Sequence, residues 1–149
     1  VTVYYHPECF EHDTRSEDCE HQESSDRLTA IRERLERLTG ITFSSDFEPA
    51  TSEALHRVHS EAYLDCLDDI EAAFLSGEMT VPEPLSPYVV RRLFPTANIH
   101  GMTMVSVGSV RAARRAAGAV IAAIDGVLLA SLTDSTDDSS HAAFCLVRP

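Results

Sequence analysis

The feature that most constrains the fold is a long apolar segment at helical spacing, followed by an apolar strand-like segment. The helix is predicted from Ser109 to about Ser131, and a turn-rich stretch of Asp and Ser occupies 134–140. His141–Val147 is then apolar enough to lie inside a parallel sheet. A helix that leads into a buried strand is the unit of α/β folds. The side chains expected on one side of this helix are Val110, Ala113, Ala117, Ile121, Ile124 and Leu128.

The first third of the chain shows the same alternation of strand and helix. Val1–Tyr5 is rich in β-branched and aromatic residues and predicts a strand. A helix capped by Ser25 or Asp26 follows, and Gly40 is well placed to end it. Ile41–Phe47 is the second predicted strand. This order favours parallel strands with helices between them.

The middle of the chain predicts two further helices and an irregular connection. A short helix is capped by Thr51 or Ser52, and a longer one runs from Ser60 to Gly77. The segment 81–87 contains three prolines, so we expect an irregular connection that continues to the long helix. Three strands make an incomplete sheet. The expected fold class is therefore α/β, with a parallel sheet of which only part is present.

Composition limits the partners of this chain. Its 149 residues suit a single domain, and its formal net charge is −12 with every basic residue an arginine. Such acidity argues against direct binding to nucleic acid or to an anionic membrane. It is compatible with attraction of a cationic partner such as a basic protein tail. The alternative is that the charge only aids solubility.

The sequence predicts an intracellular protein, in the nucleus or the cytoplasm. No stretch is expected to approach the eighteen or so apolar residues of a membrane span, and the first residues lack the pattern of a signal peptide. The four cysteines are too few and too scattered for a disulfide-rich scaffold, so we expect reduced thiols.

Two groups of polar residues admit opposite interpretations. The loop 6–25 holds five of the eleven Cys and His residues, and zinc prefers such ligands, but their spacing matches no standard zinc finger. The alternatives are a solvated loop, or a disulfide between Cys9 and Cys19 under oxidation. Arg111, Arg114 and Arg115 are interpreted as a solvated helix face. The carboxylates Asp68, Asp69 and Glu71 are interpreted in the same way.

Five segments, in order, resemble the histone deacetylase family. They are Val3–Thr14 (VYYHPECFEHDT), His21–Leu28, Arg57–Leu64 (RVHSEAYL), Thr103–Gly118 and Ala143–Pro149 (AFCLVRP). The resemblance covers nearly the whole chain. It implies the arginase/deacetylase α/β fold, with residues 1–149 as the N-terminal portion, about a third, of a single catalytic domain. It further implies a sheet wider than this chain provides.

The resemblance also implies metal-assisted hydrolysis of acetyl-lysine amides. In the family a zinc ion polarises the acetyl carbonyl and activates water, and a histidine pair moves the protons. The family's zinc ligands and histidine pair follow the segment that resembles this chain. No catalytic residue is therefore expected within 1–149, and the segment alone should be inactive. The remainder of the same polypeptide is expected to supply the chemistry.

The resemblance places the rim of the acyl-lysine pocket at Asp13 and at His100, Gly101 and Met102. Many family members carry an aspartate where this chain has Met102, and a thioether is at best a weak hydrogen-bond acceptor. An arginine that lines an inner channel in many members falls here on Ser24. Either an altered substrate preference or a lower activity on peptides is therefore expected.

A second, structural zinc site is implied by some relatives, the class IIa members, which use His and Cys from this loop. On that basis His12, Cys19 and His21 are the candidate ligands, with His100 as a remote partner.

Three functions stay open on the sequence. The first is a histone-type deacetylase, a regulator of chromatin whose substrate is an acetylated basic protein or peptide. The second is a truncated, non-enzymatic scaffold, which would need a partner to cover its exposed sheet edge. The third is an acetylpolyamine deacetylase, which the acidic charge also suits.

Overall fold

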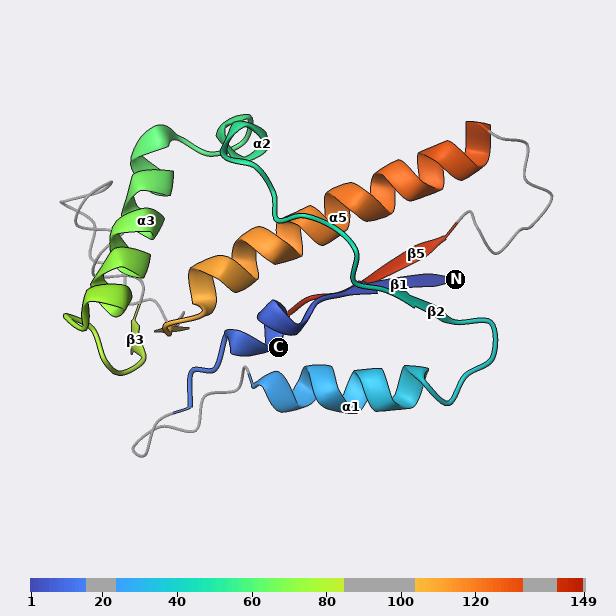
Figure 1. Ribbon diagram of the computed structural model, residues 1–149, viewed down its shortest axis with the longest axis horizontal. Coiled ribbons are helices and arrows are strands. Elements are labelled where there is room, and N and C mark those ends of the chain that lie inside the picture. The colour runs from blue at the N-terminus through green and yellow to red at the C-terminus, as the bar shows by residue number, and fades with distance from the viewer. Residues whose placement is uncertain (16–23, 85–103, 133–141, 149) are drawn as a thin grey trace.

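The computed structural model describes residues 1–15, 24–84, 104–132 and 142–148 (Figure 1). A three-stranded sheet lies between two helices, α1 (Ser25–Leu35) on one face and α5 (Ser109–Leu132) on the other. Helices α2 (Ser52–His56) and α3 (Glu61–Ser76) lie near the N-terminal half of α5, on its side away from the sheet. The expected α/β layering is confirmed.

All three strands of the sheet are parallel. Their order is β2-β1-β5, with β1 (Thr2–Tyr5) between β2 (Thr42–Ser44) and β5 (Ala143–Leu146). In register, Val3 lies opposite Phe43 on one side and Phe144 on the other. The predicted parallel sheet is confirmed, although β2 and β5 are shorter than expected.

Helix α1 covers the sheet with a narrow apolar face. Ser24 caps it, accepting a hydrogen bond from the amide of Asp26, so the cap lies one residue earlier than expected. Leu28 is fully buried in a cluster with Val3, Cys9 and Leu146. The helix ends at Leu35 rather than near Gly40. Gly40 instead has a φ of 76° in the turn that leads to β2.

Helix α5 buries mainly its small residues, and of the six side chains predicted to share one side of this helix only Val110 is buried. The buried positions of this helix are Ser109, Val110, Ala112, Gly118, Ala119 and Ala123. Ile121, Ile124 and Leu128 are 42%, 53% and 57% exposed. Small residues let the helix axis approach neighbouring backbone: a Cβ at Gly118 would lie 3.0 Å from the amide nitrogen of Ala50. Close approach, rather than apolar bulk, selects the buried face.

Helix α5 is also apolar enough, by length and composition alone, to cross a membrane. Its most apolar 18-residue window has a mean hydropathy of 1.7, which corrects the expectation that no stretch approaches a span. Length and apolarity do not distinguish a spanning helix from one that covers a sheet. Here α5 contacts β1 and β5, so its place in the fold is that of a covering helix.

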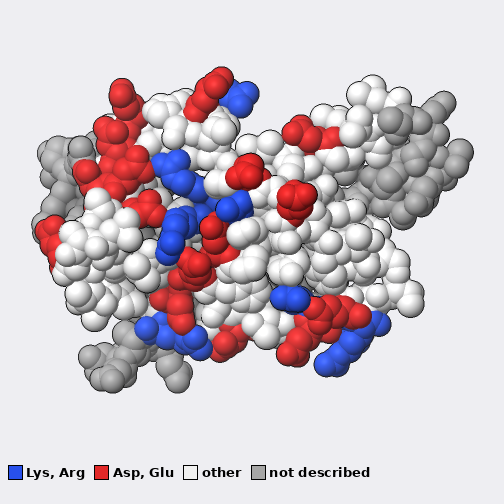
Figure 2. Space-filling view, viewed as in Figure 1, with Lys and Arg blue, Asp and Glu red and all other residues white. Residues whose placement is uncertain are grey.

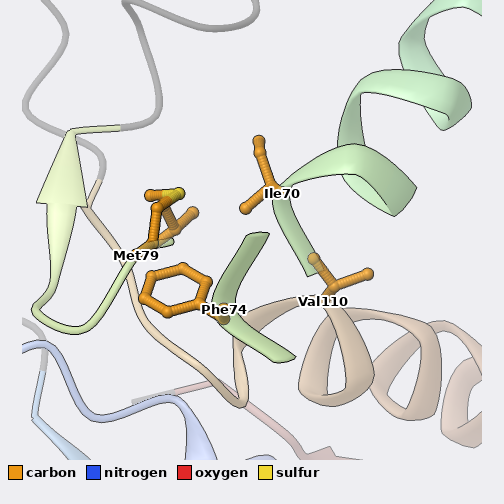
Figure 3. Packing of buried hydrophobic residues seen from close by; sticks show 5 residues of the cluster. Ile70, Phe74, Met79 and Val110 are labelled. Carbon is orange, nitrogen blue, oxygen red and sulfur yellow. The ribbon is translucent and has the colours of Figure 1, made fainter. Parts of the chain in front are cut away.

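A second apolar cluster joins α5 to α3 (Glu61–Ser76). Ile70 and Phe74 of α3 pack with Met79 and with Val110 of α5, and Met79 lies beside the Phe74 ring (Figure 3). The hydroxyl of Ser60 caps α3, and Gly77 ends it with a φ of 79°. Both boundaries were predicted from the sequence. The short helix α2 (Ser52–His56), capped by Thr51, is likewise confirmed.

Three short elements were missed by the sequence interpretation. A 3-10 helix, η1 (Pro7–Glu11), lies within the stretch expected to be a loop, and the imidazole of His6 caps it by accepting the Glu8 amide. The expected irregular connection contains β3 (Glu83–Pro84), which pairs antiparallel with β4 (Met104–Val105). Elements this short carry no periodicity that a sequence pattern could reveal.

Candidate functional site at the carboxyl ends of the strands

A pocket of about 360 Å³ opens near the carboxyl ends of β1 and β5. Ligands of parallel α/β sheets bind at this edge because loops and helix N-termini converge there. Its polar lining comes from His12, after η1, from Ser109 at the start of α5 and from Arg148, after β5. The walls are largely apolar and include Tyr63, Leu67, Met104, Val110, Ala113 and Val147.

A hydrogen-bonded group of three side chains lies at the pocket mouth. The Nδ1 atom of His12 is 2.7 Å from the hydroxyl oxygen of Ser109. The same oxygen accepts the backbone amide of Ser106 at 2.7 Å and lies 3.1 Å from the Ser106 hydroxyl. Ser106 and Ser109 are buried, so this arrangement satisfies polar groups that water cannot reach. It also fixes His12 beside the pocket.

Asp13, the described member of the predicted substrate rim, is held by an ion pair. The Arg15 side chain donates to both Asp13 carboxylate oxygens and reaches Asp26 of α1 at 3.3 Å. Hydrogen bonds from Arg15 lower the pKa of Asp13, against a smaller opposing effect of burial. Asp13 is therefore ionised at neutral pH and tied to the start of α1.

Of the arginines at the start of α5, Arg111 is exposed as expected, whereas Arg114 and Arg115 are partly buried, which corrects the interpretation of a solvated face for these two. Arg111 pairs with Glu11 at 2.9 Å, and Arg114 pairs with Asp68 of α3 at 2.6 Å. Arg111 also lies 4.0 Å from Glu71, so two of the α3 carboxylates interpreted as solvated have partners. Basic and acidic side chains are accordingly interleaved on the face shown in Figure 2. The pairing is tertiary, so helical periodicity could not reveal it.

Arg115 is the most buried of these arginines, with its side chain 13% exposed. Its Nε donates to Glu8 of η1 at 2.6 Å, and another guanidinium nitrogen donates to the Phe47 carbonyl oxygen, after β2. The hydrogen bond raises the pKa of Arg115 and lowers that of Glu8. One side chain thus joins η1, α5 and the segment after β2.

The structure does not test the predicted structural zinc site as a whole. His12 is described and lies at the pocket, whereas Cys19, His21 and the proposed remote partner His100 lie outside the described residues. The described part of the chain contains no group of three or more Cys, His, Asp or Glu placed to hold a metal. It therefore provides no ligand set for the catalytic zinc that the resemblance implies.

Other predictions about the rim and the cysteines are tested only in part. The rim residues Gly101 and Met102 lie outside the described segments. Ser24, at the position of the channel arginine, serves here as the α1 cap. Cys9 is a free thiol, fully buried, and burial raises its pKa to about 11. Such a thiol is a poor metal ligand, because metals bind the thiolate.

The sequence interpretation missed the roles of Ser106 and Ser109, which hold His12 beside the pocket, and of Arg115, which binds η1. The signal available was the TMVSVGS segment, which contains both serines and was used only to recognise the family. No local pattern indicated Arg115, because its partner Glu8 lies 107 residues away.

Comparison with known proteins agrees with this fold. The match of the chain to the crystal structure of the HDA15 HD domain has a TM-score of 0.65 and 21% sequence identity. The match covers all of this chain but 36% of that structure, so the chain spans about a third of its length. No curated protein sequence matches the chain. The model of the histone deacetylase domain matches residues 21–149, most of the sequence. The chain therefore belongs to the histone deacetylase family.

Proposed function

We propose that this chain is the N-terminal portion of a zinc-dependent deacetylase that hydrolyses acetyl-lysine amides. The observation that carries the proposal is the family match over residues 21–149, which includes the pocket residues Ser109 and Arg148. In the family the histidine pair follows directly after the corresponding Arg-Pro. The remainder of the polypeptide would then complete the pocket, of which this chain forms one wall.

Within this proposal the described residues bind and orient rather than react. The zinc, when bound by residues outside this segment, supplies a Lewis acid and an activated water. Apolar side chains such as Leu67 and Val110 keep water from one wall of the pocket. Asp13 presents a carboxylate at the rim, and His12 presents a ring fixed by Ser109.

The proposed substrate is an acetylated lysine in a basic protein or peptide, such as a chromatin protein in the nucleus or a cytoplasmic protein. A net charge of −12 supports this choice, because long-range attraction raises the encounter rate of a cationic partner. Acetylated polyamines have the same charge sign and the same amide, so they form the competing substrate class.

One observation also fits a second, non-enzymatic function. Large apolar side chains are exposed along the outer side of α5, and Phe144 on the edge strand β5 is 47% exposed. Surfaces of this kind are covered in stable proteins. In the scaffold alternative a separate partner protein covers them, whereas in the deacetylase the rest of the domain does so.

The decisive experiment uses the full-length protein that carries this segment. Purified protein is assayed on acetyl-lysine peptides and on acetylated polyamines, before and after metal removal, and its zinc content is measured by elemental analysis. We expect about one zinc per chain, hydrolysis of the peptides, and loss of activity on chelation. Hydrolysis of acetylated polyamines but not of acetyl-lysine peptides would show that the protein is an acetylpolyamine deacetylase. A folded protein without zinc and without activity on either class would support the scaffold instead.

A further inference from the structure

We infer that Arg115 is a positioning residue that holds the rim loop, residues 12–14, over the pocket. This inference rests on the proposed function for its kinetic consequence, although its structural part stands without it. Arg115 touches neither the pocket nor the rim loop in the described contacts. It acts through η1, the element that leads directly into His12.

The geometry of η1 explains how a distant arginine can act on the rim. η1 lies against the N-terminal end of α5, and a Cβ at Gly108 would collide with the backbone of Glu11. Arg115 binds Glu8 near the start of η1, and Arg111 binds Glu11 at its end. Ser109 then holds His12, the next residue along the chain. Side chains from the start of α5 therefore bind η1 at both of its ends and bind the rim loop at His12.

Arg115 combines two properties that neither neighbouring arginine has together. Its side chain is 13% exposed, compared with 49% for Arg111 and 21% for Arg114. It also makes a second contact with the Phe47 carbonyl, which fixes the guanidinium plane between two segments. A shielded arginine with two acceptors orders its partners more strongly than an exposed ion pair does.

Substitutions can separate the effect of the Arg115 charge from the effect of its two hydrogen bonds. Arg115→Gln removes the charge and both defined donors, and Glu8→Gln removes only the carboxylate. Arg115→Lys keeps the charge but cannot bind Glu8 and Phe47 in one fixed plane, so it should rescue in part. Arg114→Gln is the matched control, because it removes a neighbouring arginine that pairs with α3 instead of η1.

The test measures kinetics and backbone protection in the full-length protein. For Arg115→Gln we expect KM for an acetyl-lysine peptide to rise about fivefold or more, with kcat changed less than about twofold, because orientation of the rim affects binding. Hydrogen exchange should accelerate in peptides covering residues 8–14 and stay unchanged in β5. The double variant with Glu8→Gln should be no worse than the poorer single variant.

Several outcomes would overturn the inference. Unchanged exchange in residues 8–14 of Arg115→Gln would do so whether or not the protein is an enzyme. Equal losses with Arg114→Gln, or a uniform rise in exchange that includes β5, would show a general loss of stability. If Arg115→Gln does not fold, Arg115→Lys and Glu8→Gln decide by the same measurements. An inactive wild type with the expected exchange pattern would refute the proposed function and leave the positioning role intact.

Discussion

The imidazole of His12 and the hydroxyl of Ser109 lie 2.7 Å apart, although 97 residues separate them in the sequence. Their contact joins the loop after η1 to the first residue of α5. It brings the early part of the connection between β1 and β2 to the start of the helix that precedes β5. The pocket at the carboxyl edge of the sheet is therefore shaped by both connections together.

Ser109→Ala should destabilise the protein by about 1 to 3 kcal/mol, because it leaves the buried Ser106 amide without its acceptor and removes the contact between Ser109 and His12. The measurement is the free energy of unfolding in denaturant. Ser131→Ala is a matched control on the exposed end of the same helix and should have little effect. Equal stability of both variants would contradict the assigned role of Ser109.

Gly118→Ala should destabilise the fold by about 1 to 3 kcal/mol, although alanine favours helices by about 1 kcal/mol. The new Cβ would meet backbone atoms of the segment 48–50, which cannot rotate away. At Gly126 a Cβ would lie 2.6 Å from the hydroxyl of Tyr4, the end of a side chain, so Gly126→Ala should cost less. Thermal unfolding of both variants tests the order. A more stable Gly118→Ala would contradict the close approach of α5.

Glu8 should make stability depend on pH in the acidic range. The hydrogen bond from Arg115 holds the pKa of Glu8 below its ordinary value of 4.5, and burial opposes this shift. Its contribution is therefore present above that value and is lost as pH falls through the lower folded-state pKa. The difference in unfolding free energy between wild type and Glu8→Gln should shrink from about pH 7 to about pH 3. A difference independent of pH would exclude the ion pair as its source.

Cys9 should resist alkylation in the folded protein. Burial raises the pKa of its thiol to about 11 from 9.0, so the reactive thiolate is about a hundredfold scarcer than in the unfolded chain. Because the folded state retains its proton, stability should fall as pH rises between these values. Mass spectrometry after brief iodoacetamide treatment at about pH 8 should show Cys145 modified before Cys9, since Cys145 is only half-buried. Rapid native modification of Cys9 would show that the core around η1 opens.

The sequence by itself determined the local elements and their order. The caps of α2 and α3 and the end of α3 could be predicted because each depends on one or two adjacent residues, such as Ser60 and Gly77. The parallel sheet followed from the alternation of strands and helices. Family membership followed from segments in order, whereas the rim role of Asp13 and the zinc-ligand role of His12 that it implied stay predictions.

Only the tertiary structure decided which face of α5 is buried and how the site residues meet. Helical spacing located the branched stripe, but the sheet and the segment after β2 accept only the face with Gly118 and Ala119. The partners of Arg115 and Ser109 lie about a hundred residues away and come together through packing. Local propensity carries no information about such contacts, because they exist only once the layers have assembled.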